Sequence, residues 1–326
     1  MTRLRWLILI FGPWPIMGSS WAVSSWFKAD TSGAPARNVA IVGAAHTVNQ
    51  FAAHAPPPPV STADGQLAQA CRRAAEQLAQ RTPADFHVVV KAPFVVAGDL
   101  SRQALEAYYD ETIVPAVQAM QARYFRSRPD EPITVLLFSG EKSYNHYAGA
   151  LFGDSGVSIY GYYKPVERTL LVNIATGSGT LLHELTHALF AFEVRDPPDW
   201  LNEGLASLHE QCRFRTDARG PWIEGLVNWR LAGLQTVIRQ RRLRSLESLI
   251  DDADFRSALV GTNYAQARYF CLYLQQRGVL ESFVAEVCAS HPRDPQGMAA
   301  VLRALNGKSW PEIDRDFQHW ALALTE

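Results

Sequence analysis

Apolar residues in the first half of the chain recur with periods that alternate between helix and strand. A helical period runs over Gly65–Arg81 and again over Arg102–Phe125, where Ser101 is placed to cap the second helix. Short runs dense in apolar residues predict the strands of a half-buried sheet. These runs are Phe86–Lys91, Pro93–Ala97, Ile133–Phe138, Ser158–Tyr163 and Thr169–Ile174.

The second half of the chain is patterned differently. After Trp200 the apolar spacing is helical almost throughout, which predicts an all-helical C-terminal subdomain. The expected helices are Leu201–Arg213, Trp222–Arg239, Ala265–Gln276, Leu280–Ala289, Gln296–Leu305 and Trp310–Leu324. Strands that come first and helices that come last indicate an α+β fold rather than alternating β-α-β units.

One apolar helix carries a cluster of polar residues. The helix-patterned run Thr180–Phe192 contains His183-Glu184-Leu185-Thr186-His187. Residues four apart share one face of a helix, so His183 and His187 can bind the same cation, and zinc is a metal that imidazole holds well. Glu184 is rotated by about 100° from His183. It can therefore reach a water at the metal without being a ligand, which is the place of a general base.

A third ligand is expected from the next helix. The segment Arg195-Asp196-Pro197-Pro198 ends the first helix, because proline cannot continue one and the residue before proline avoids the α region. Asp199 is a good N-cap for a helix that begins at Trp200, and Glu203 then lies about 6 Å into that helix. A helical hairpin brings Glu203 level with both histidines, and two His with one Glu is a catalytic zinc ligand set.

The motif as a whole resembles that of a known family. His183–His187 followed by Trp200-Leu201-Asn202-Glu203-Gly204-Leu205-Ala206 is similar to the gluzincin metallopeptidases, in particular the peptidase-MA-like family. The likeness extends over Phe94 to Trp320 and is specific only at the metal site. It implies a zincin-like fold in which an edge strand, Ser158–Tyr163 or Thr169–Ile174, pairs with an extended peptide or protein substrate.

The resemblance also implies roles for individual residues. It implies one Zn²⁺ per chain, bound by His183, His187 and Glu203, with Glu184 as the base. Tyr264 resembles the position of a tyrosine that donates to the oxyanion. Packing at a helix start is the alternative interpretation of Tyr264.

Other positions near the site are less defined. Tyr269 and His209 are the fallback oxyanion donors, and His209 is expected at the surface or behind the ligands. Ser207 stands where several related enzymes carry an acid that holds a ligand histidine. The partner of the ligand histidine is therefore left unassigned.

The N-terminal residues are expected to precede the folded domain. Arg3 and Arg5 come before the apolar run Trp6–Met17, and Ser20-Trp21-Ala22 offers a cleavage site. Residues 1–23 are therefore interpreted as a signal peptide or, alternatively, an uncleaved anchor. Residues 24–62 form an Ala- and Pro-rich linker, and residues 63–326 form the metallopeptidase domain, divided into 63–195 and 196–326. An exported protein is predicted, periplasmic or extracellular, with membrane anchoring that faces the periplasm as the alternative.

Composition narrows the classes of protein further. A formal net charge of −1 argues against a nucleic-acid binder. The four cysteines, Cys71, Cys212, Cys271 and Cys288, show no C-x-x-C spacing, which disfavours a cysteine metal cluster. Three disulfide pairings stay open, with Cys271–Cys288 favoured among them and free thiols as the alternative.

These patterns together predict a zinc-dependent hydrolase of peptide bonds, a secreted metallopeptidase. The alternative is a non-catalytic domain on a degenerate zincin fold that binds peptide or cell-envelope material. Glu184 argues against this alternative, because binding alone has no use for a base.

Overall fold

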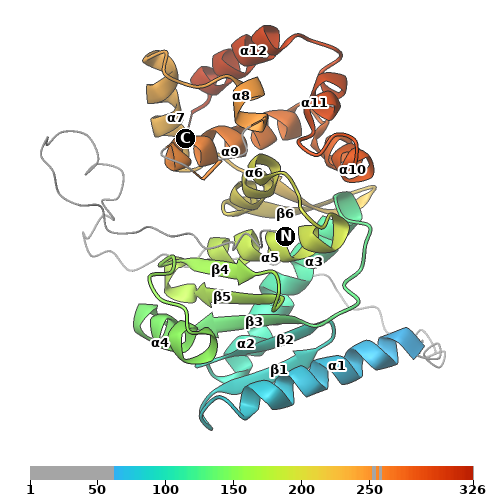
Figure 1. The fold of residues 1–326 in the computed structure, drawn as a ribbon, viewed down its shortest axis with the longest axis vertical. Helices are drawn as coiled ribbons and strands as arrows, with labels where there is room; N and C mark the ends of the chain where they lie inside the picture. Colours follow the sequence, from blue (N-terminus) through green and yellow to red (C-terminus); the bar gives the residue numbers. More distant parts are fainter. Residues whose placement is uncertain (1–61, 252–254, 257–258, 326) are drawn as a thin grey trace, which may run out of the picture. The chain divides into compact units, whose positions relative to one another are not determined.

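A five-stranded mixed sheet organises the first half of the chain (Figure 1). The computed structural model describes residues 62–251, 255–256 and 259–325. The strands lie in the order β1-β2-β3-β5-β4. Strands β2, β3 and β5 are parallel, whereas the edge strands β1 and β4 are antiparallel to their neighbours. Their bounds are β1 His87–Lys91, β2 Phe94–Gly98, β3 Ile133–Phe138, β4 Gly161–Lys164 and β5 Thr169–Asn173.

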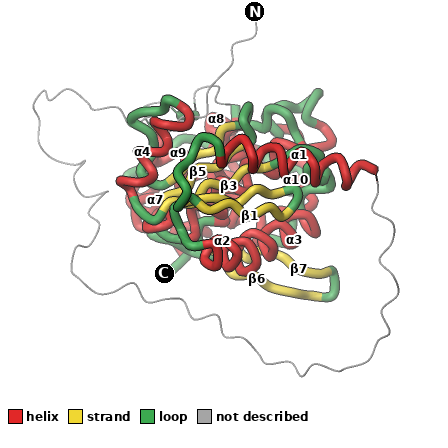
Figure 2. The backbone as a smooth tube through the Cα atoms, turned by 90° about the horizontal axis from the view of Figure 1, so that it is seen from below, coloured by secondary structure: helices red, strands yellow, loops and turns green. Residues whose placement is uncertain are grey.

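Helices cover both faces of this sheet (Figure 2). Alternate residues along each strand point to opposite faces. On one face, Leu136 and Leu171 pack with residues of α1 (Thr62–Ala79) and α4 (Glu141–Phe152). On the other face, Val135 and Val172 join a larger core that continues into the second half of the chain. The helices on that face are α2 (Arg102–Tyr108), a π-helical turn (Tyr109–Ile113), α3 (Val114–Arg123) and α5 (Ser178–Glu193).

The second half of the chain is built around α9 (Val260–Gln276), which is buried along most of its length. It contacts α6 (Asp199–His209), α7 (Arg230–Arg239), α10 (Leu280–Ser290) and α12 (Trp310–Ala323). The short helices α8 (Leu246–Ile250) and α11 (Met298–Ala304) complete this part. A sheet-containing half followed by a mainly helical half agrees with the predicted α+β class.

The prediction of an all-helical second half is wrong at one place. Residues expected at the end of one helix and the start of the next form a β-hairpin, β6 (Cys212–Asp217) and β7 (Gly220–Gly225). Strand β6 is almost entirely exposed, so it lacks the alternating apolar pattern that marks a half-buried strand. Arg123 of α3 holds the hairpin turn by donating to Asp217 (2.6 Å) and to the Gly220 carbonyl (2.8 Å).

Two helices were not expected from the sequence. Helix α4 buries Tyr144, Ala148 and Leu151 at helical spacing and ends at Gly153, whose φ of 71° is left-handed. Helix α8 has a Ser245 cap but only five residues, too few for periodicity to be recognised. The predicted helix Arg102–Phe125 is present, with the π-helical turn inside it.

Several expectations concern cysteines and the N-terminus. All four cysteines are free thiols, so the Cys271–Cys288 pairing is not formed. The predicted signal peptide or anchor (1–23) and nearly all of the linker (24–62) lie outside the described residues. Among the helices of the described part, none is long and apolar enough to span a membrane.

Candidate metal centre and active site

His183 and His187 lie on helix α5, in a part of the helix that is buried in the protein. All of its residues from Leu181 to Phe190 are buried, and the helix packs against β4 and β5. The helix begins at Ser178 after Gly177, and no side chain caps it. In Figure 1, α5 lies beside the edge strand β4. The two histidines predicted to bind a metal therefore lie next to one edge of the sheet.

Helix α6 returns alongside α5, as the prolines in the connection predicted. It begins at Asp199 and follows Pro198, one residue earlier than expected. Gly179 allows the start of α5 to meet the end of α6, because a Cβ there would collide with the backbone oxygen of Glu210. Trp200, almost fully buried, fixes the other end by donating to the Gln296 carbonyl at 2.9 Å. The helical hairpin that was predicted to carry Glu203 towards the histidines is present.

The three predicted ligand side chains converge. Glu203 Oε2 lies 3.3 Å from His183 Nε2 and 3.6 Å from His187 Nε2. One ligand atom from each side chain lies within 4.8 Å of the other two, and all three residues are buried. Oε2 of Glu203 is buried without a hydrogen-bond partner. This group could hold a metal ion, because a buried carboxylate oxygen without a partner is costly unless a cation or donor meets it.

Each imidazole faces an oxygen on the side away from Glu203. His187 Nδ1 donates to Asn202 Oδ1 at 2.8 Å. His183 Nδ1 lies 3.0 Å from Glu210 Oε1, and Glu210 is also held by Arg230 at 3.2 Å. Partners of this kind fix ring orientation and leave Nε2 for a metal. The sequence left these partners unassigned.

Ser207 stands where several related enzymes carry an acid that holds a ligand histidine, but it does not hold one here. Ser207 Oγ is buried and has no hydrogen-bond partner in the described structure, so it holds neither histidine. Glu210 supplies the acid instead. It stands seven residues after Glu203, and seven residues are two helical turns. That spacing is a signal from which the sequence could have identified it.

Charges around the ligand group favour a cation between them. Burial alone would raise the pKa of Glu203, but Arg256 and the two histidines hold it well below its usual range. Burial would likewise lower the pKa of His183, but Glu203 and Glu210 raise it. Both shifts show a local field that stabilises positive charge beside Glu203.

Glu184 differs from the other carboxylates of the site. It is only 3% exposed, and burial is the main cause that raises its pKa. Its charge is felt by both histidines and by Glu203, so it lies beside the ligand group. A carboxylate with a raised pKa near the ligands is suited to accept and return a proton.

Tyr264 lies near the ligand group, because Arg256 contacts both Tyr264 and Glu203. Its ring is 6% exposed, and its Oη accepts a hydrogen bond from Arg256 Nη1 at 3.0 Å. Burial and the charge of Glu203 raise its pKa well above the usual value, so the hydroxyl keeps its proton. A protonated hydroxyl at this place can donate to a developing oxyanion.

The two fallback donors are engaged elsewhere. Tyr269 Oη donates to the Asn228 carbonyl at 2.9 Å and accepts from the Asn228 backbone nitrogen at 3.0 Å. His209 is fully buried rather than at the surface, and its Nδ1 is 2.9 Å from Thr186 Oγ1. Burial lowers the pKa of His209 to about 3, so it is neutral. His209 therefore supports α5 from behind the ligands.

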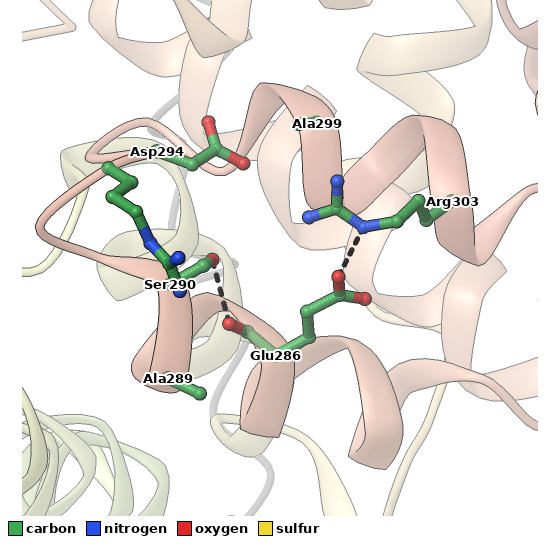
Figure 3. A pocket seen from close by; sticks show the side chains of 7 residues that line it. Glu286, Ala289, Ser290, Asp294, Ala299 and Arg303 are labelled. Carbon is green, nitrogen blue, oxygen red and sulfur yellow. Dashed lines mark hydrogen bonds and ion pairs between the residues drawn. The ribbon is translucent and has the colours of Figure 1, made fainter.

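A surface hollow lies between α10 and α11 (Figure 3). It shares no residue with the ligand group. Arg303 pairs with Glu286, and Asp294 accepts from the Ala300 backbone nitrogen at 3.0 Å. The residues that line this hollow include no histidine, so it offers no ligand set like that of His183, His187 and Glu203.

Comparison of the sequence with protein-family models and with curated proteins gives no match.

Proposed function

We propose that this protein is a zinc-dependent peptidase of the zincin type. The convergence of His183, His187 and Glu203, with one oxygen of Glu203 lacking a partner, supports the metal site most directly. Two imidazoles and one carboxylate form a ligand set typical of catalytic zinc, in which a position is left for water. Oxygen-preferring cations such as Ca²⁺ and Mg²⁺ fit this nitrogen-rich set less well.

The proposed chemistry divides between the metal and the buried side chains. When bound, Zn²⁺ acts as a Lewis acid towards the scissile carbonyl and lowers the pKa of water. Glu184 then accepts the proton of the attacking water and delivers it to the leaving amine. The Tyr264 hydroxyl donates to the oxygen on which negative charge develops.

The edge strand β4 supports an extended peptide as the substrate. It is antiparallel to β5, and no described strand pairs with its other side. Ile159 and Tyr160, just before this strand, are 51% and 41% exposed. An extended chain that adds to β4 gains backbone hydrogen bonds and places a peptide bond near α5. Of the two strands expected to form the edge, β5 lies inside the sheet, so the substrate strand is assigned to β4.

The metal site is tested by metal content. The purified protein should hold about one zinc per chain, measured by mass spectrometry of the metal. His187→Ala should lose most of it, because two remaining ligands bind weakly. His319→Ala is the matched control, since His319 is an exposed histidine outside the ligand group. Full zinc retention in a His183→Ala/His187→Ala double variant would place the metal elsewhere.

The chemistry is tested separately by Glu184→Gln. This variant should keep zinc and fold but lower kcat by about 10²–10⁴-fold on a mixed peptide substrate, because it removes the proton carrier and leaves every ligand. Wild-type protein that binds zinc but cleaves no peptide would support the non-catalytic binding domain instead. Cleavage by Glu184→Gln at the wild-type rate would refute the proposed role of Glu184.

A further inference from the structure

One guanidinium joins the metal-ligand group to Tyr264. Arg256 Nη2 binds Glu203 Oε1 and lies 3.4 Å from Asp199 Oδ1, while its Nη1 donates to Tyr264 Oη at 3.0 Å. Arg256 precedes α9 and is part of no helix or strand. Its side chain is 26% exposed, whereas Glu203 is fully buried. A residue outside the helices and strands thus places one cationic side chain between Glu203 and Tyr264.

The contact with Arg256 gives the two carboxylate oxygens of Glu203 different partners. Oε1 of Glu203 is occupied by Arg256, while Oε2 faces both Nε2 atoms at 3.3 and 3.6 Å and has no hydrogen-bond partner. With Oε1 engaged by Arg256, Oε2 is the oxygen that Glu203 presents to a metal between the two histidines. A ligand that binds through one oxygen leaves more of the coordination sphere open for water and substrate.

The contact also directs the Tyr264 hydroxyl. A phenol oxygen both accepts and donates. Because Arg256 Nη1 occupies the accepting side, the hydroxyl proton is turned towards another acceptor. A charged donor polarises the O–H bond as well, which strengthens its donation.

We propose that Arg256 is a positioning residue that presents Glu203 to the metal through a single oxygen and orients Tyr264 as a donor at the same site. This inference rests on the proposed metallopeptidase function. Arginine is required rather than lysine, because one planar fork reaches two different acceptors from separate nitrogens, whereas an ammonium acts as a point charge.

The test uses Arg256→Lys and Arg256→Gln in the full protein. Arg303→Gln is the matched control, since Arg303 also pairs with a glutamate but is 54% exposed and outside the site (Figure 3). Each variant is loaded with cobalt, whose visible absorption reports ligand number, and zinc affinity is measured by competition with a chelator. The kcat of each zinc-loaded variant is measured on a mixed peptide substrate, and circular dichroism confirms folding. Arg256→Lys keeps the positive charge next to Glu203, so it still tests the inference if Arg256→Gln does not fold.

Three results are expected. Arg256→Gln should bind zinc about 10–100-fold more weakly, with a changed cobalt spectrum. Arg256→Lys should keep more of the zinc affinity, yet lower kcat to the level of Tyr264→Phe, because it still neutralises Glu203 but no longer orients the hydroxyl. The control, Arg303→Gln, should match wild type in zinc affinity, cobalt spectrum and kcat.

Failure of this inference can be separated from failure of the proposed function. Wild-type cobalt spectra and zinc affinity in both Arg256 variants would overturn the positioning role, even where Glu184→Gln abolishes cleavage. An altered spectrum in the Arg256 variants of a protein that cleaves no peptide would support the positioning of Glu203 and reject the peptidase.

Discussion

Gly204→Ala tests how the packing of α6 on α9 places Glu203. A Cβ at Gly204 would lie 2.9 Å from the Ala267 carbonyl oxygen and 2.9 Å from Cys271 Sγ, whereas ordinary contacts begin at 3.4 Å. The overlap of about 0.5 Å meets a backbone atom and a fully buried side chain, so neither can rotate away. Overpacking costs about 1–3 kcal/mol. Because the added Cβ meets a backbone oxygen that cannot move aside, we expect the upper part of this range, about 2–3 kcal/mol, and the better helix propensity of alanine offsets about 1 kcal/mol of it.

We therefore expect a net loss of about 1–2 kcal/mol in the free energy of unfolding. For a domain of this size, that loss lowers Tm by about 2–8 °C. Calorimetry measures the shift, and zinc content measured on the same sample should fall, because Glu203 precedes Gly204 and moves with α6.

Gly261→Ala is the matched control for this experiment. Gly261 also lies in a helix, but an added Cβ has no atom within 4 Å. The same change there should leave Tm unchanged or raise it slightly, because alanine reduces the freedom of the unfolded chain. A Gly204→Ala variant that melts at or above the wild-type temperature would refute the close approach of α6 and α9.

Two further predictions concern single functional groups. Tyr264→Phe should lower kcat by about 10²–10³-fold with KM little changed, since a hydrogen bond to the oxyanion forms only in the transition state; a wild-type kcat would mean that Tyr264 only packs. Glu210→Gln should weaken zinc binding by about 10–100-fold in chelator competition, because it removes the charge behind His183. Ser207→Ala should leave that affinity unchanged, and the opposite ranking of the two variants would return the role to Ser207.

The convergence of the three proposed metal ligands could be predicted from the sequence because local rules determine where they lie. His183 and His187 are one helical turn apart, and the prolines after Glu193 limit where α6 begins. The connection is too short for α6 to lie elsewhere than beside α5. Periodicity, helix ends and a short connection are enough to bring Glu203 to the histidines, as the structure confirms.

The residues that support the ligands depend on long-range packing instead. Arg256 lies 53 residues from Glu203 in sequence and in a segment without periodicity, so no local rule links them. The β6–β7 hairpin could not be predicted from the sequence for a related reason. Its strands are stabilised by Arg123, which is 94 residues from Asp217, rather than by an apolar face of their own.

The carboxylates of the site give a physical reason to prefer catalysis over binding. Glu203 and Glu210 each contact an arginine, Arg256 and Arg230. Glu184 has no lysine or arginine within ion-pair distance among the residues that the structure describes, although it is 3% exposed. A carboxylate buried without a cationic partner is destabilising in its charged form, and a domain that only binds peptide would be more stable with an apolar residue there. The position of Glu184 therefore supports its proposed role, in which it accepts and returns a proton beside the proposed metal site.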